Sequence, residues 1–192
     1  MVDELHALLD AREGHFSLES GLHGNLWLDL DTPFSQPQQL EPLAARLADL
    51  LMPYRPEVVC GPLVGGALLA QLVAVSATLR LTYAERVAVV PDTLWSARYQ
   101  LVRAFRNLVH GQRVVVVDDV VNAGSALRST VAAVREAGGD VVATGALLRL
   151  GDTVLTYLAE QALPLHTLAV RPASTWPPDL CPLCQQGQPL DT

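Results

Sequence analysis

Two adjacent carboxylates follow directly after a run of four valines. Asp118 and Asp119 come after residues 114–117, and the stretch that follows, residues 120–126, consists mostly of small side chains. Two acids at the end of a buried strand are costly unless they are paired or solvated. A small-residue loop before a helix offers free backbone N–H groups that suit a phosphate. The pattern favours a ligand with hydroxyl groups or magnesium beside a phosphate, such as a ribose 5-phosphate. The alternative is an acidic cap on an ordinary turn, with Ser125 as the helix N-cap.

A glycine-rich turn, residues 61–66, follows the short apolar run 58–60. Its glycines permit backbone conformations that expose N–H groups toward a diphosphate. The turn lacks the G-x-G-x-x-G spacing of a dinucleotide site and the lysine of a nucleotide-binding P-loop. Taken alone, it is explained equally well as a simple reversal of chain direction.

Apolar runs alternate with helical patterns along the second half of the chain. The predicted strands are 58–60, 79–83, 114–117, 141–148 and 165–170, and the predicted helices are 67–75, 126–137 and 153–162. Strands that are apolar on both faces and alternate with helices indicate an α/β fold, with a parallel sheet of about five strands flanked by helices. Ligands of such sheets bind beyond the carboxyl ends of the strands, where both turns lie.

Other segments give weaker patterns. Asp3 is placed to cap a helix that ends near Gly14, and residues 16–30 resemble a hairpin or paired short strands. Apolar spacing predicts a helix over 40–52, whereas 84–109 is mixed. The tail from Arg171 is rich in proline and is expected to lie over the surface.

Composition excludes several classes of function. The chain has 192 residues, half of them apolar, and a formal net charge of −7, which excludes a broad electrostatic nucleic-acid binder. All 13 basic residues are arginines, so lysine chemistry is excluded. The longest apolar stretch, Leu63–Ala77, is shorter than the roughly 20 residues of a membrane span. The start carries three acids and no basic residue, unlike a targeting signal. We therefore expect a soluble, cytoplasmic protein.

Residues 114–126 resemble the phosphoribosyl-pyrophosphate (PRPP) signature of type I phosphoribosyltransferases, and 60–67 resemble the family's pyrophosphate loop. The resemblance implies that Asp118 and Asp119 act in catalysis by holding the ribose hydroxyls. Arg86 stands where the family has an arginine that contacts pyrophosphate. Mg²⁺ held mainly by PRPP and water, and a homodimer, are also implied. The implied PRPP-binding residues are Gly61, Pro62, Leu63, Val64, Gly65, Gly66, Arg86, Val120, Val121, Asn122, Ala123, Gly124, Ser125 and Ala126.

Further matches resemble the orotate phosphoribosyltransferase branch of this family. Residues 16–21, followed by 27–29, resemble its amino-terminal hood, and 147–151 resemble the segment whose arginine binds the base. The implied base-binding residues are Phe16, Ser20, Gly21 and Arg149. Arg149 is equally well explained as a solvated arginine at a strand end. The implied organisation is a phosphoribosyltransferase domain over 1–170, with a hood of about 1–35 and a core of about 40–170, and then a tail over 171–192.

The chain departs from that branch at two lysine positions. Glu19 replaces a hood lysine, and residues 91–100 replace a mobile lysine-rich loop. Arg98 or Arg103 could stabilise charge on the departing pyrophosphate, although both could instead line a surface helix. Three functions follow as hypotheses. The favoured one joins PRPP to a nitrogenous base, preferably orotate, giving orotidine 5′-phosphate and releasing pyrophosphate. The others are a non-catalytic PRPP-binding regulator and a transferase for another base.

Cys181 and Cys184 have the spacing of half a zinc site. Cys60, His166 or the same pair from a second subunit could complete it, but inert thiols in the tail are the favoured interpretation. The spacing of the remaining histidines suggests no metal cluster; they are His6, His15, His23 and His110.

Overall fold

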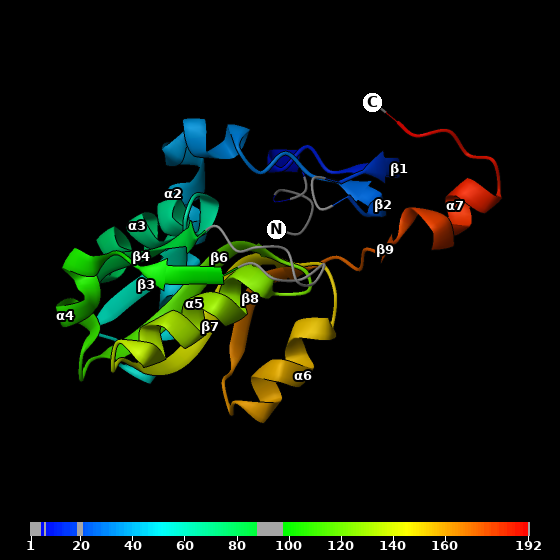
Figure 1. Ribbon diagram of the computed structural model, residues 1–192. Helices are drawn as coiled ribbons and strands as arrows, with labels where there is room; N and C mark the ends of the chain where they lie inside the picture. Colours follow the sequence, from blue (N-terminus) through cyan, green and yellow to red (C-terminus); the bar gives the residue numbers. More distant parts are fainter. Residues whose placement is uncertain (1–4, 6, 19–20, 88–97, 192) are drawn as a thin grey trace.

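The computed structural model describes residues 5, 7–18, 21–87 and 98–191, which form two β-sheets flanked by helices (Figure 1). The strands are β1 (Arg12–Ser17), β2 (His23–Trp27), β3 (Val58–Pro62), β4 (Arg80–Val87), β5 (Arg98–Leu101), β6 (Arg113–Val121), β7 (Asp140–Arg149), β8 (Leu165–Val170) and β9 (Thr175–Trp176). The α-helices are α2 (Pro37–Leu51), α3 (Gly65–Ala77), α4 (Arg106–Val109), α5 (Ser125–Glu136), α6 (Thr153–Glu160) and α7 (Pro182–Gln185). Short 3₁₀ turns cover Thr32–Ser35, Met52–Tyr54, Arg103–Phe105 and Pro178–Leu180.

The large sheet has the strand order β5-β4-β3-β6-β7-β8. All neighbouring strands run parallel except β5, which pairs antiparallel with β4 at one edge. The predicted α/β fold is therefore confirmed. The sixth strand lies in the segment whose pattern was mixed, because a four-residue edge strand has too few residues to show a period.

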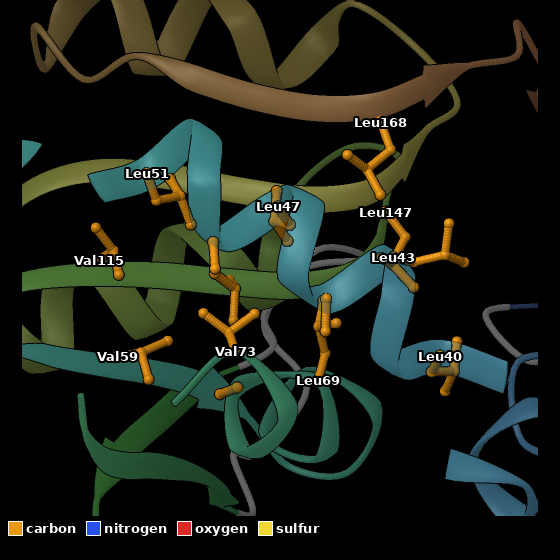
Figure 2. Packing of buried hydrophobic residues seen from close by; sticks show 14 of the residues in the cluster. Leu40, Leu43, Leu47, Leu51, Val59, Leu69, Val73, Val115, Leu147 and Leu168 are labelled. Atoms are coloured by element: carbon orange, nitrogen blue, oxygen red, sulfur yellow. The ribbon is translucent and has the colours of Figure 1, made fainter. Parts of the chain in front are cut away.

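Alternating side chains of the central strands supply two separate hydrophobic cores. Val59, Val115 and Val117 face the cluster formed with α2 and α3, which Figure 2 shows from close by. Val114 and Val116 point to the opposite cluster, formed with α5 and α6. Both faces of β6 are thus buried, which explains why the strand reads as a continuous apolar run.

Helix α2 illustrates how sequence spacing sets packing. Its buried residues recur every three or four positions: Leu40, Leu43, Ala44, Leu47, Ala48 and Leu51. This apolar stripe lies on the sheet, and Pro37 is at the start of the helix, where its missing N–H costs nothing. In the described part of the chain, no helix combines the length and apolarity needed to cross a bilayer.

The second sheet, which we call the hood sheet, has the order β1-β2-β9 with antiparallel pairs. The predicted paired strands in 16–30 are confirmed. A helix reaching Gly14 is wrong, because β1 begins at Arg12, and the helical residues described before it are 5, 7 and 8. The tail contributes β9, so segments from the two ends of the chain lie side by side in one sheet (Figure 1).

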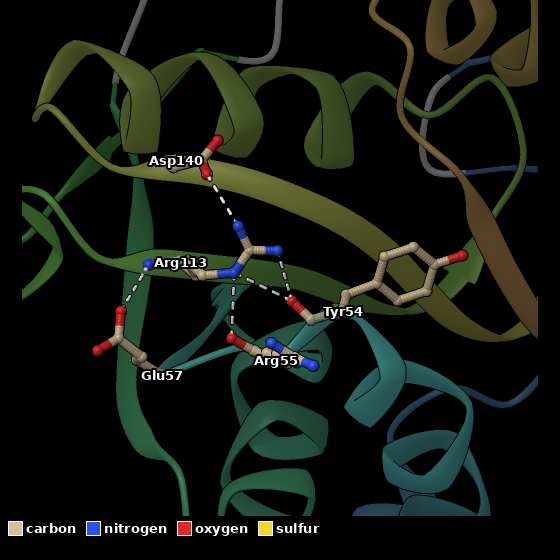
Figure 3. A network of polar contacts seen from close by, with 5 residues as sticks. All are labelled: Tyr54, Arg55, Glu57, Arg113 and Asp140. Carbon is tan, nitrogen blue, oxygen red and sulfur yellow. Dashed lines mark hydrogen bonds and ion pairs between the residues drawn. The ribbon is translucent and has the colours of Figure 1, made fainter.

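At the amino end of β6, Arg113 is surrounded by acceptors (Figure 3). Its guanidinium donates to the carbonyl oxygens of Tyr54 at 2.7 Å and Arg55 at 3.3 Å, and it pairs with Asp140 at 3.6 Å. Its backbone N–H donates to Glu57 Oε2 at 3.0 Å. This network ties the loop before β3 to the start of β6 and β7.

Candidate functional site

A cavity of about 670 Å³ lies between the hood sheet and the carboxyl ends of the central strands. Its volume is in the range of small-molecule sites. Three groups of residues line it. From the hood side come Ser17, Leu18, Leu26, Trp27, Leu28, Asp29, Leu30 and Asp31. From the large sheet come Pro62, Leu63, Val64, Gly65, Gly66, Tyr99, Asp118, Asp119, Val120, Asn122, Ala126 and Leu150, and from the tail come Ala173, Ser174 and Thr175.

The acid pair lies within β6 rather than in the loop after it. The strand extends to Val121 because pairing with β7 continues past the acids, with Asp118 opposite Ala146. Asp118 is only 7% exposed, and burial, together with the charge of Asp119, raises its pKa well above the ordinary value. Burial also raises the pKa of Asp119. Because burial disfavours the charged form of the pair, a ligand that brings hydroxyl donors or cations would stabilise it.

The glycine-rich turn packs directly against this pair. A Cβ atom at Gly65 would collide with the Asp119 carboxylate, so only glycine allows the backbone of the turn to come this close. Five residues of the turn, 62–66, line the cavity, and the peptide bond between Leu63 and Val64 is cis. The sequence prediction that both turns meet at one edge of the sheet agrees with this arrangement.

The loop before α5 forms a second cavity of about 250 Å³ that shares Asp118, Val120 and Asn122 with the first. Gly124 is the N-cap of α5 and adopts φ +76°, a left-handed conformation that favours glycine. No described side chain caps the helix, so the alternative that Ser125 is an ordinary N-cap is wrong. The first N–H groups of α5 therefore face this smaller cavity without a side-chain partner among the described residues, as an anion site requires.

The charge on the cavity lining is strongly negative. Asp29 and Asp31 stand opposite the acid pair, and no arginine or histidine is among the described lining residues. Hydrogen bonds from Thr32 hold the pKa of Asp29 below its ordinary value. Hard carboxylate oxygens of this kind suit Mg²⁺, so a polyphosphate could enter together with divalent cations.

The predicted arginines lie around the cavity rather than among its described lining residues. Arg86 is exposed on β4 and is paired in register with Tyr99, which lines the cavity. Arg98 immediately precedes Tyr99 in β5, so the two side chains point to opposite faces of the sheet. Arg149 donates to the carbonyl oxygen of Gly151 at 3.0 Å and pairs with Asp152. Its role in base binding stays a prediction.

Other predicted residues have supporting positions. Phe16 is buried under the hood sheet, and Gly21 makes the hairpin turn with φ +78°. Val121 packs in the core, and Gly61 lies against the backbone of Gly66. Ser20 and residues 91–97 of the altered loop lie outside the described part of the chain.

Three lining features were not predicted from the sequence. Tyr99 lines the cavity together with the two acids, and burial and the charge of Asp118 raise its pKa. Asp31 and the tail residues 173–175 also line the cavity. Neither Tyr99 nor the tail gave a sequence signal, because β5 has only four residues and β9 only two.

Comparisons with known proteins agree with this geometry. Residues 36–158 match the family model of the phosphoribosyl transferase domain. The chain is 33% identical over 178 residues to an orotate phosphoribosyltransferase of Caldanaerobacter subterraneus subsp. tengcongensis, a match that covers 93% of this chain and 87% of the relative. It is 32% identical over 180 residues to one from Thermotoga maritima, covering 93% and 89%.

Solved structures share the fold at lower identity. Orotate phosphoribosyltransferase from Aeropyrum pernix superposes with a TM-score of 0.68 at 22% identity, covering 88% of this chain and 93% of that one. Adenine phosphoribosyltransferase from Thermoanaerobacter pseudethanolicus gives a TM-score of 0.69 at 18% identity, covering 88% and 99%. At these identities the likeness concerns the fold alone.

Proposed function

This chain belongs to the phosphoribosyltransferase family, as its sequence predicts, and from that premise we propose that it transfers ribose 5-phosphate from PRPP to orotate. The products are orotidine 5′-phosphate and pyrophosphate. Orotate is favoured over other bases because relatives at 32–33% identity over most of the chain carry that name.

One observation carries the proposal. The buried acid pair, the glycine-rich turn and the N-terminus of α5 without a side-chain cap border two adjoining cavities. PRPP carries hydroxyls, a diphosphate and a 5-phosphate, one kind of group for each of these three features. We assign the ribose hydroxyls to Asp118 and Asp119, the 5-phosphate to the loop 122–126, and the diphosphate to the turn 61–66.

The reaction forms a bond from a nitrogen of the base to the anomeric carbon of PRPP. The bond from that carbon to the pyrophosphate oxygen breaks, and pyrophosphate leaves with the electron pair. Because the bond to pyrophosphate breaks ahead of bond formation, positive charge develops on the ribose ring, and the nitrogen of the base gives up its proton to water as the new bond forms. The carboxylates of Asp118 and Asp119 hold the ring in position and stabilise this charge, and the hood sheet excludes water from it.

Mg²⁺ fits the acid-rich cavity, and the proposal includes it. The donors present are the carboxylates of Asp118 and Asp119, with Asp29 and Asp31 across the cavity. When bound, the ion neutralises charge on the diphosphate. Its coordination is completed mainly by PRPP and water, in keeping with the octahedral preference of the ion.

A product assay tests the proposed substrate. The protein is incubated with Mg²⁺, PRPP and either orotate or a panel of other bases, and new nucleotides are identified by mass spectrometry. Orotidine 5′-phosphate supports the proposal. A nucleotide from another base contradicts the choice of orotate. Magnesium-dependent PRPP binding without any product contradicts transfer and favours a PRPP-binding regulator, consistent with the lack of lysine in the chain.

Arg149 is the proposed base-selecting residue, because it directly precedes Leu150, which lines the cavity. Removing the guanidinium in Arg149→Ala should raise the KM for orotate about tenfold, the loss of one charged hydrogen bond. The Kd for PRPP should stay within about twofold, measured by calorimetry. Asp152→Asn is the matched control, because it removes the partner of Arg149 and leaves the guanidinium in place. A parallel fall in PRPP affinity would contradict this role.

The proposal also covers assembly and location. We expect a cytoplasmic homodimer, as the family resemblance and the sequence imply. Light scattering coupled to size-exclusion chromatography measures the assembly directly, and a monomeric mass at micromolar concentration would contradict a dimer.

A further inference from the structure

Four side chains that are distant in the sequence meet at the outer end of the hood sheet. His15 comes from β1, His23 from β2, and Cys181 and Cys184 from the tail around α7. One ligand atom of each lies within 4.8 Å of all the others. Figure 1 shows the tail passing from β9 to α7 beside this end of the sheet. None of these residues belongs to the lining of the cavity described above.

Four of the six distances between the ligand atoms of the cluster are close to those in a tetrahedral zinc site, and all six are within 4.8 Å. Bond lengths of about 2.3 Å to sulfur and about 2.0 Å to nitrogen place a nitrogen and a sulfur about 3.5 Å apart, and two nitrogens about 3.3 Å apart. The His15 Nε2 atom lies 3.4 Å from Cys181 Sγ and 3.6 Å from Cys184 Sγ. His23 Nδ1 lies 3.2 Å from Cys184 Sγ and 3.1 Å from His15 Nε2.

A hydrogen bond fixes the tautomer of His15 so that its Nε2 atom is available as a metal ligand. The carbonyl oxygen of Gln188 lies 2.8 Å from His15 Nδ1 and can only accept, so Nδ1 carries the proton. In the neutral ring, Nε2 then presents its lone pair to the centre of the cluster. Metal-ligating histidines commonly donate their second ring N–H to a carbonyl in this way, which fixes the tautomer and the ring orientation.

Three of the four residues of the cluster are buried. His15 and Cys181 are fully buried, His23 is 9% exposed, and Cys184 is exposed. Two imidazole nitrogens and two sulfurs converge there within hydrogen-bonding distance of one another. A cation satisfies them together, since ionised thiolates and neutral imidazoles are the ligands that Zn²⁺ prefers.

We propose that His15, His23, Cys181 and Cys184 bind one Zn²⁺ ion in a structural site that joins the tail to the hood sheet. The chain supplies all four ligands, so no position is left for a substrate. The two thiolate ligands distinguish this site chemically from a magnesium site, which has oxygen ligands. The structure places His15 and His23 together with the two cysteines, so the expectation that the histidines join no cluster is wrong. Inert thiols in the tail are the alternative to this proposal. Neither Cys60 nor His166 belongs to this group.

The site would reinforce contacts that already hold the tail. The backbone N–H of His15 donates to Asp191 Oδ2 at 2.8 Å, and the N–H of Asp191 donates to the His15 carbonyl at 2.6 Å. Arg171 pairs with Glu13 at 2.8 Å. Residues 173–175, which lie between the contacts of Arg171 and Asp191, form part of the cavity wall. Zinc would thus fix part of that wall without touching the substrate.

Metal analysis tests the proposal independently of transferase activity. Protein without an affinity tag is produced with zinc in the medium, dialysed against a weak chelator and analysed by mass spectrometry for metals. We expect one zinc per chain. Cys181→Ser combined with Cys184→Ser should lower zinc affinity at least 100-fold, whereas His110→Asn, which removes an exposed histidine outside the cluster, should keep full zinc content.

Cobalt identifies the ligands even where a variant folds poorly. Co²⁺ added to the metal-free wild-type chain should give a thiolate charge-transfer band and the intense visible bands of tetrahedral coordination. In Cys184→Ser, whose side chain is exposed, the charge-transfer band should weaken while circular dichroism stays unchanged. Less than about 0.2 zinc per chain after zinc titration would overturn the proposal. A Cys181–Cys184 disulfide in protein purified under reducing conditions would do the same.

Discussion

The two ends of β6 differ in whether their charged side chains have partners of opposite charge. At the amino end, the guanidinium of Arg113 donates hydrogen bonds to two backbone carbonyl oxygens and pairs with the carboxylate of Asp140 (Figure 3). At the carboxyl end, Asp118 is buried beside the half-buried Asp119, and none of the described residues that line their cavity is an arginine or histidine. The first arrangement stabilises the protein, whereas the second raises the pKa of both acids and costs stability. Acidic charge without a basic partner therefore makes this end of the sheet the candidate functional site.

The largest expected effect comes from neutralising the acid pair. Asp118→Asn with Asp119→Asn removes two charged hydrogen-bond acceptors for ribose, so PRPP affinity should fall about 1000-fold. The same change should raise the melting temperature of the ligand-free protein by a few degrees, because buried charge is removed. Calorimetry and thermal unfolding measure the two effects. Undiminished PRPP binding would contradict the proposed role of the acid pair. A lower melting temperature would contradict the claim that the pair costs stability.

Gly65 gives the next effect in size. In Gly65→Ala the new methyl group meets the Asp119 carboxylate and displaces it or the turn. A displacement near 1 Å should cost about 100-fold in PRPP affinity. Gly111→Ala is the control. Gly111 has φ +69° and open space around it, so alanine there should destabilise by about 1 kcal/mol and leave PRPP binding unchanged. Equal effects of the two variants on binding would show that the close approach is unimportant.

Arg113→Ala tests the amino end alone. Loss of the bonds to the two carbonyls should lower the free energy of unfolding by about 1 kcal/mol, or the melting temperature by about 2–4 °C. PRPP affinity should not change. Asp140→Asn removes only the exposed ion pair at 3.6 Å and should cost no more than about 0.5 kcal/mol. An Arg113→Ala variant with normal stability but weak PRPP binding would reverse the proposed division of roles.

The smallest effect is a pH dependence. The pKa values of Asp118 and Asp119 are raised in the folded chain, so the folded state binds protons more tightly than the unfolded state. The pair therefore lowers the free energy of unfolding progressively as pH rises from about 4 through the folded pKa values. The difference between the double asparagine variant and the wild type should be near zero at pH 4 and grow toward neutral pH. Denaturant titrations at several pH values measure it, and a constant difference would contradict this cause.

The core and the two turns that border the cavities could be located from the sequence because their signals are local. The four valines before Asp118 define a buried strand, and the small residues after Asp119 define the loop. The hood sheet and the cysteine–histidine cluster depend on segments about 150 residues apart, which no spacing pattern reports. Arg98 shows a further limit. Its position in the chain suggested the site, but strand alternation turns it away from Tyr99.

The pairing of β2 with β9 has a consequence for synthesis on the ribosome. Residues 58–170 contain every strand of the large sheet and can begin folding before the tail emerges. The hood sheet, by contrast, is complete only when residues 175–191 are present, because its third strand and the contacts to His15 come from them. The part of the cavity wall formed by residues 173–175 is therefore added after all strands of the large sheet have been synthesised. A chain that stops before residue 173 lacks this part of the wall.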